Sequence, residues 1–171
     1  MKFKISRSII TAILLISFAD NPIIAQTGAN NGQNDIKKFK VSIVNSDYSM
    51  AYSVLITLTN KKLEVTYSGE LVGDKDSIIF SKDMAPSDTL RQISEINISN
   101  LKEYYTNSCI SDGSQIIVRL IKNGQNKSVQ LSNYYQEEIG KIIYLINSLV
   151  PTKYKVWYDK EKLLSDYKKC H

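Results

Sequence analysis

The segment from Gln115 to Leu131 constrains the fold most, because it carries two strand-forming runs separated by a tight-turn dipeptide. The runs are QIIVRLIK (Gln115–Lys122) and KSVQL (Lys127–Leu131), and Asn123-Gly124 lies between them. Asn and Gly accept the positive φ angles of a type I′ turn, which joins adjacent antiparallel strands. The sequence therefore predicts a β-hairpin here, with a loop of two residues or slightly more.

An amphipathic helix is predicted directly after this hairpin. Its apolar stripe has spacings of 3, 1, 3 and 3 residues and consists of Ile139, Ile142, Ile143, Ile146 and Leu149. Such spacing places the side chains on one helix face, and Pro151 ends the segment because proline cannot continue a helix. A stripe of this kind usually packs into a domain core. We interpret it as a core helix and not as a membrane or partner helix.

Further strands are predicted on both sides of these elements. Four runs before the hairpin are short and apolar or alternate in the period-2 pattern of a strand. They are Val41–Val44, Ser53–Thr59, Leu63–Tyr67 and Ser77–Phe80. The turn Asn60-Lys61-Lys62 joins the second and third runs into another hairpin. Near the C-terminus, Lys153–Tyr158 alternates lysine with aromatic or aliphatic residues, a pattern that suits an edge strand.

Two more helices are predicted from their start signals. Pro86-Ser87-Asp88 is typical of a helix N-terminus, and apolar residues follow at helical spacing over Leu90–Ile96. A second helical turn is expected around Leu101–Tyr105. Asp159 can cap a last helix over Asp159–Lys169. Together the elements predict an α+β domain, in which an antiparallel sheet of about six to seven strands has two to three helices packed on one face.

The N-terminus has the pattern of a secretory signal peptide. Lys2, Lys4 and Arg7 precede eleven apolar or small residues, Ile9–Ala19. This apolar run is about half as long as the roughly 20 residues needed to span a bilayer, and it suits the export machinery. We therefore expect a secreted or periplasmic protein with no stable membrane span after cleavage. An uncleaved anchor is the alternative.

The boundaries of the chain follow from this interpretation. Residues 1–25 form the signal peptide, and a cut after Ala19 or after Ala25 is compatible with the sequence. Residues 26–38 are rich in Gly, Asn and Gln, which predicts a flexible tether. Residues 39–171 have the length of a single domain.

Two cysteines occur in the chain, Cys109 and Cys170. In an oxidising compartment they are candidates for a disulfide that closes a loop of about 62 residues and stabilises the fold by roughly 4 kcal/mol. Free thiols are the alternative. The only histidine is His171, so no internal imidazole is available to activate Cys109 as a nucleophile.

Residues for common catalytic, metal and cofactor sites are scarce. With His171 as the only histidine, neither a Ser/His/Asp nor a Cys/His arrangement can be assembled inside the domain, and no zinc-ligand cluster is present. No Gly-rich phosphate-binding loop occurs. The formal net charge is +5, and loss of residues 1–25 with Lys2, Lys4, Arg7 and Asp20 leaves 19 basic and 16 acidic residues, or +3. This excess is too small to predict a dedicated nucleic-acid binder. We expect no catalysis, no cofactor, no metal and no nucleic-acid partner.

Tyrosine is the most unusual feature of the composition, with 11 residues. Near the C-terminus Tyr154, Trp157, Tyr158 and Tyr167 are interleaved with lysines. Aromatic residues with polar tips are favoured at recognition surfaces, so these four residues are candidate binding residues. The alternative is that the aromatic rings serve the core while the lysines face water.

The order of segments from Ile96 onward resembles small secreted or periplasmic domains of unknown function from Gram-negative bacteria. The segments are INISNLKEYY, the QIIVRL and KSVQL hairpin, NYY followed by IGKIIYLINSLVP, and KYKVWYDKEKLL. This resemblance implies an extracytoplasmic setting and brings no activity, cofactor or site.

The sequence supports three hypotheses about function. The first is an exported, small, non-catalytic binding domain for a protein or glycan partner in the envelope or outside the cell. The second is a secreted hydrolase whose carboxylates converge only in the fold, with candidates among Glu64, Glu70, Asp112, Glu137 and Glu138. The third is an inhibitor or a structural interaction subunit.

Overall fold

A computed structural model describes residues 36–46, 52–69, 73–111 and 113–170. All of them belong to the unit Asn34–His171. The predicted signal peptide and all but the last three residues of the predicted tether lie outside the described residues. Of those three, Ile36 is partly buried and packs against the core, whereas Lys37 and Lys38 are exposed.

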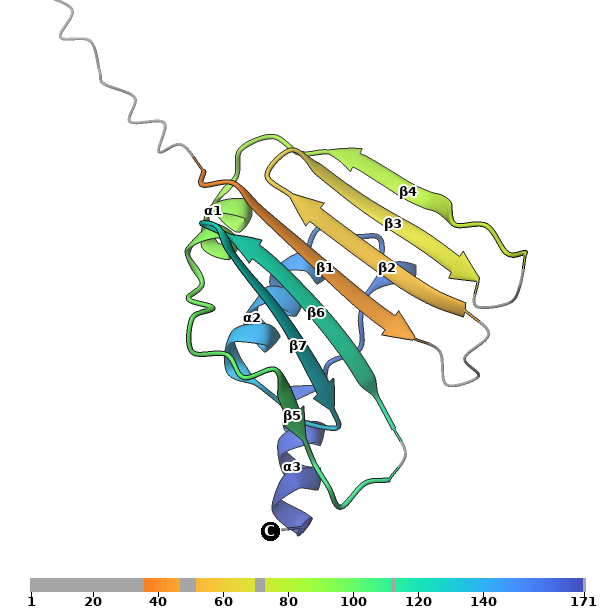
Figure 1. Cartoon of the computed structure of the whole chain (residues 1–171), viewed down its shortest axis with the longest axis vertical. Helices are drawn as coiled ribbons and strands as arrows, with labels where there is room; N and C mark the ends of the chain where they lie inside the picture. Colours follow the sequence, from red (N-terminus) through yellow and green to blue (C-terminus); the bar gives the residue numbers. More distant parts are fainter. Residues whose placement is uncertain (1–35, 47–51, 70–72, 112, 171) are drawn as a thin grey trace, which may run out of the picture. The chain divides into compact units, whose positions relative to one another are not determined.

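In the part of the chain that the structure describes, seven strands form one sheet (Figure 1). They are β1 (Phe39–Ser46), β2 (Tyr52–Thr59), β3 (Lys62–Gly69), β4 (Ser77–Asp83), β5 (Tyr104–Thr106), β6 (Gln115–Lys122) and β7 (Gln125–Ser132). The order across the sheet is β4-β3-β2-β1-β6-β7-β5. Every neighbouring pair is antiparallel except β5 and β7, which are parallel.

Two helices, α1 (Asp88–Glu95) and α2 (Glu137–Asn147), lie against one face of this sheet (Figure 1). A third helix, α3 (Lys160–Cys170), lies beyond the ends of β5 and β7, and a short 3₁₀ turn, η1 (Thr152–Tyr154), lies between α2 and α3 in the sequence. The predicted α+β class, with its mostly antiparallel sheet, is therefore confirmed.

The core fills the space between the sheet and the helices. In the central strands the buried apolar side chains alternate along the chain, and Ile43 of β1 lies opposite Ile56 of β2 and Val118 of β6. The helix side of the core comes from the predicted isoleucine stripe. Ile142 and Ile146 of α2 are 1% and 0% exposed, which confirms that this helix packs into the core.

The predicted hairpin is formed by β6 and β7. Lys122 pairs with Gln125, so the loop has two residues, Asn123 and Gly124. Their φ angles are 50° and 76°, the left-handed values that a type I′ turn requires. The dipeptide thus sets the register of the two strands.

A side-chain cap lies at the N-terminus of each of the helices α1, α2 and α3. The Ser87 hydroxyl accepts a hydrogen bond from the Leu90 backbone N–H at the start of α1. The Asp159 carboxylate accepts one from the Lys162 N–H at 2.9 Å, as predicted for the last helix. At α2 the cap is Gln136, whose side-chain oxygen accepts from the Ile139 N–H at 2.7 Å. A glutamine is an uncommon cap, so no start signal for this helix is visible in the sequence.

Two predicted elements are wrong. The helical turn expected around Leu101–Tyr105 is instead the edge strand β5, because the backbone of β7 has hydrogen-bonding groups available on that side. The Gln130 N–H donates to the Glu103 carbonyl at 2.7 Å, and the Asn107 N–H donates to the Ser132 carbonyl at 2.9 Å. These bonds form a parallel ladder that no local pattern could reveal.

The second error is the strand expected over Lys153–Tyr158, which is η1 followed by an extended segment outside the sheet. The side chain of Asn147 explains this difference. Its Nδ2 donates to the Val156 carbonyl at 2.8 Å, and its Oδ1 accepts from the Val156 N–H at 2.9 Å. The amide thereby satisfies the backbone groups that a neighbouring strand would otherwise satisfy. The lysines of this segment consequently do not line a sheet edge.

Candidate binding groove

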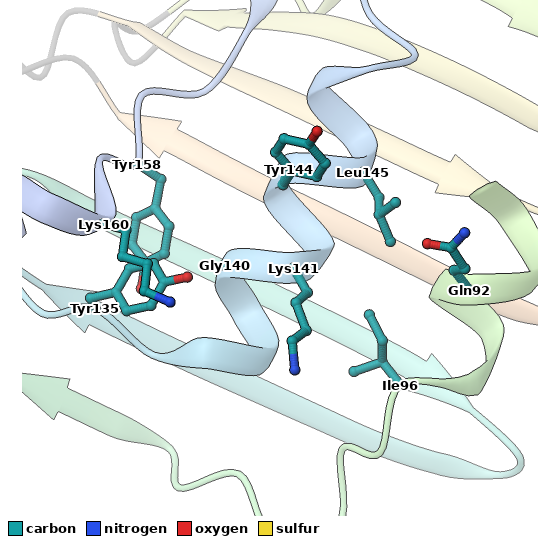
Figure 2. A pocket seen from close by; sticks show the side chains of 9 residues that line it. All are labelled: Gln92, Ile96, Tyr135, Gly140, Lys141, Tyr144, Leu145, Tyr158 and Lys160. Carbon is teal, nitrogen blue, oxygen red and sulfur yellow. The ribbon is translucent and has the colours of Figure 1, made fainter.

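An open groove of about 450 Å³ lies between α1, α2 and the start of α3 (Figure 2). Its lining residues are Gln92, Ile96, Tyr135, Gly140, Lys141, Tyr144, Leu145, Tyr158 and Lys160. Figure 2 shows Tyr135, Tyr158 and Lys160 together at one end. Gln92, Ile96 and Leu145 lie at the other end, with the exposed side of α2 between them. We call this hollow the tyrosine groove.

The first end of the tyrosine groove is built on a pair of stacked rings. Tyr135 and Tyr158 lie 5.3 Å apart between centroids at an interplanar angle of 26°. The Tyr158 hydroxyl accepts from the Gln136 N–H at 2.8 Å and donates to the Tyr134 carbonyl at 2.9 Å. Burial raises the pKa of Tyr158 well above its usual value, so the phenol stays protonated. Tyr158 thus supports this end of the tyrosine groove, because its hydroxyl joins the C-terminal segment to the residues at the start of α2.

Gly140 allows the Tyr135 ring to lie directly on α2. A Cβ atom at this position would lie 2.7 Å from Cζ of Tyr135 and still closer to its hydroxyl oxygen. No real Cβ makes such a contact. Any larger residue at position 140 must therefore displace Tyr135 or shift the helix.

Two lysines of the tyrosine groove share one carboxylate. The ammonium of Lys160 lies 3.0 Å from one oxygen of Glu137, and that of Lys141 lies 4.0 Å from the other. Lys160 also lies 5.2 Å above the ring centroid of Tyr135. The hydrogen bond to Glu137 raises the pKa of Lys160, so this lysine is fully charged at neutral pH. Burial and the nearby Glu137 raise the pKa of Tyr135, which keeps that phenol protonated.

Tyr144 provides the exposed aromatic surface of the tyrosine groove. It lies on the solvent side of α2 and is 76% exposed, more than any other large hydrophobic residue in the described part of the chain. Lys141 lies one turn earlier on the same helix, and Gln92 of α1 contributes an amide. The partly buried Ile96 and Leu145 complete the apolar lining. The groove therefore combines a ring face with hydrogen-bond donors on both sides.

The four aromatic residues singled out from the sequence do not form one surface. Tyr158 lines the tyrosine groove, whereas Trp157 is 53% exposed and is not part of its lining. The Tyr154 hydroxyl donates to the Ile79 carbonyl at 3.1 Å, which places this ring beside the edge strand β4. Tyr167 of α3 packs edge-on against Tyr134 at 5.3 Å. Their roles in binding stay predictions.

Sequence reasoning missed most of the groove-lining residues. Gln92 and Lys141 carry no distinguishing local pattern, since charged and amide side chains are common on exposed helix faces. Tyr144 did carry a signal, because it interrupts the polar side of the isoleucine helix with a large ring. A bulky aromatic residue on the helix face opposite an apolar stripe is not required for packing of the core, so it indicates a surface with another role.

The two cysteines lie in different elements. Cys109 follows β5, is exposed, and its backbone N–H donates to the Asn107 side chain at 3.2 Å. Cys170 is the last residue of α3, and its side chain lies outside the described part of the structure. The disulfide between them stays a prediction.

The chain has no match among the protein-family models and curated protein sequences compared with it. In the ranges that the structure describes, no helix has the length and apolar character needed to cross a bilayer, and no three His, Cys, Asp or Glu side chains are grouped as metal ligands.

Proposed function

We propose that this chain is an exported, non-catalytic carbohydrate-binding domain and that the tyrosine groove is its binding site. One observation carries the proposal. The groove is open, presents the exposed ring of Tyr144 beside lysine and amide donors, and has no Asp or Glu among its nine described lining residues. A shallow aromatic surface with polar groups suits a sugar, whereas hydrolysis of a glycosidic bond needs a pair of carboxylates.

The chemistry of a sugar ring matches this surface in two ways. One face of a pyranose consists largely of C–H groups, and such a face can pack on the Tyr144 ring. The hydroxyl groups at the ring edge can accept hydrogen bonds from Lys141 and Gln92. The stacked pair of Tyr135 and Tyr158 makes the wall rigid, so little conformational entropy is lost on binding.

Export and a disulfide are part of the same proposal. The signal-peptide pattern of residues 1–25 supports a secreted or periplasmic protein. A chain of ring contacts supports the disulfide, because Tyr105 of β5 stacks on Tyr134 at 5.4 Å and Tyr134 contacts Tyr167 of α3. Cys109 follows Tyr105 by four residues, and Cys170 lies three residues after Tyr167 on the same helix. The rings thus bring the two cysteine-bearing segments towards each other.

A binding experiment with matched variants tests the proposal. The purified mature domain is screened against an immobilised glycan panel, and the best oligosaccharide is measured by isothermal titration calorimetry. Tyr144→Ala should weaken binding by about 1 to 2 kcal/mol, which corresponds to roughly 5- to 30-fold. Tyr104→Ala is the matched control, because Tyr104 is 69% exposed but lies on edge strand β5. Failure of every glycan to bind would refute the proposal.

An interaction subunit is the second candidate, and the edge strand β4 favours it. Ile78 and Ile79 are 61% and 40% exposed there. An exposed apolar edge can pair with a strand of a protein partner. Two features oppose such pairing. The register of β4 against β3 shifts between Val65 and Thr66 of β3, and the Tyr154 hydroxyl already donates a hydrogen bond to the Ile79 carbonyl. Ile78→Lys separates the candidates, because it should leave glycan affinity unchanged if the tyrosine groove is the site.

The hydrolase hypothesis receives no support from the described carboxylates. Glu64 pairs with Lys62 on β3 at 2.7 Å, and Glu137 pairs with Lys160 at the start of α2. These carboxylates lie on different elements and are engaged by lysines. Of the other carboxylates considered from the sequence, Glu138 accepts from the Gln136 amide. Glu70 and Asp112 lie outside the described residues.

A further inference from the structure

A second hollow adjoins the tyrosine groove at Ile96, which lines both. It has a volume of about 280 Å³ and follows the loop after α1 and the end of the β6–β7 hairpin. Its polar lining includes Lys37, Glu95, Asn97, Lys122 and Gln125. We call it the loop hollow. The shared residue makes the two hollows neighbouring parts of one surface.

Two lysines give the loop hollow its charge. The ammonium of Lys122 donates to the Ile96 carbonyl at 2.6 Å, which fixes its position beside the shared residue. Burial and the neighbouring positive charge of Lys37 lower the pKa of Lys122. Two ammonium groups that repel each other create a place where an anion is stabilised. Glu95 is the acidic residue of this hollow.

The tyrosine groove repeats this excess of positive charge. Lys141 and Lys160 both form ion pairs with Glu137, so two positive charges are balanced by one negative charge. Across both hollows four lysines line the surface, whereas Glu95 is the sole carboxylate among the described lining residues. A neutral sugar would leave this excess uncompensated. A ligand that carries negative charge at intervals would neutralise it along the whole path.

We propose that the ligand is an acidic oligosaccharide whose chain runs from the tyrosine groove past Ile96 into the loop hollow, an inference that rests on the proposed function. One sugar ring packs on Tyr144, and its acidic group lies near Lys141 and Lys160. A second acidic group lies between Lys37 and Lys122. Carboxylate and sulfate substituents share this chemistry, and the probes below distinguish them.

The test compares matched probes by calorimetry on the mature domain. The first probe is an oligogalacturonate, the second is the same oligomer with its carboxyl groups reduced to alcohols, and the third is a sulfated galactan oligomer. The acidic probes should bind at least about tenfold tighter than the reduced one, and binding should weaken with added salt. Preference for the carboxylate or for the sulfate probe identifies the natural substituent.

Charge variants locate the acidic groups on the surface. Lys37→Gln and Lys141→Gln change exposed side chains, one in each hollow, and each should weaken acidic binding by about three- to fivefold. Lys37→Gln should leave binding of the reduced oligomer unchanged. Lys141→Gln should weaken it less than it weakens acidic binding, because Lys141 also donates a hydrogen bond to a sugar hydroxyl in the proposed function. Lys82→Gln and Lys168→Gln are the controls, because both lysines are exposed and lie outside the two hollows.

The outcomes separate this inference from the proposed function. Equal binding of the acidic and the reduced oligomers, with loss in Tyr144→Ala, overturns the acidic ligand and leaves carbohydrate binding intact. If acidic binding weakens in Lys141→Gln but not in Lys37→Gln, the path of the ligand into the loop hollow is overturned. Equally tight binding of a single-stranded oligonucleotide of the same charge also overturns the inference, because the surface would then select charge and not sugar. No binding of any oligosaccharide refutes both proposals.

Discussion

Gly140→Ala should change the stability of the domain in opposite directions, depending on whether Tyr135 is present. Alanine favours a helix over glycine by about 1 kcal/mol, which stabilises α2. In the native background, however, the new Cβ collides with the Tyr135 ring, since its three nearest atoms all belong to that side chain. Overpacking typically costs about 1 to 3 kcal/mol, and loss of the stack on Tyr158 adds about 0.5 to 1.5 kcal/mol. The net expectation is a loss of about 0.5 to 3.5 kcal/mol.

The Tyr135→Ala background removes the collision and leaves the helix preference. Gly140→Ala should then raise the free energy of unfolding by about 0.5 to 1 kcal/mol. The four proteins of this double-mutant cycle are compared by urea unfolding, followed by circular dichroism at equal protein concentration. An effect of the same sign and size in both backgrounds would refute the claim that Tyr135 lies on the α2 backbone.

Three further predictions concern the core, the cysteines and export. Ile142→Ala and Ile146→Ala should each lower the free energy of unfolding by about 2 to 5 kcal/mol, because both side chains are buried; a melting temperature within a degree or two of wild type would contradict their place in the core. Non-reducing peptide mass spectrometry of the exported protein should find Cys109 linked to Cys170, and two free thiols would remove the bridge. Terminal sequencing of that protein should begin at Asp20 or Gln26, whereas retention of Met1 would contradict cleavage.

The parts of the fold that were predicted correctly have causes that are local in sequence. Asn123-Gly124 determines its turn through its own φ angles, and the stripe from Ile139 to Leu149 determines a helix face by spacing alone. Asp159 caps the helix that it immediately precedes. Each of these signals acts over fewer than about a dozen residues, which is the range where propensity and pattern are informative.

The errors arose where hydrogen bonds that leave no mark in the local sequence pattern decide the structure. β5 forms because the backbone of β7 accepts it as a parallel neighbour, a contact between segments about 25 residues apart. The segment around Val156 leaves the sheet because Asn147 bonds to its backbone. The groove has the same character, since its lining extends from Gln92 to Lys160 and is assembled only when α1, α2 and the C-terminal segment meet. Of its lining residues, Tyr158 was named from the sequence, whereas Tyr144 was missed although its place on the polar side of the helix is visible there.

The most direct test of the account is an NMR titration of the ¹⁵N-labelled mature domain with the oligosaccharide that binds best. The largest amide shifts should fall on residues 92–96, 135–145 and 158–160, which surround the tyrosine groove, and they should disappear in Tyr144→Ala. The acidic oligomer should extend the shifts to Lys37 and Lys122 of the loop hollow. Shifts centred on the exposed edge of β4, or no saturable shifts with any oligosaccharide, would contradict the assignment of the groove as the binding site.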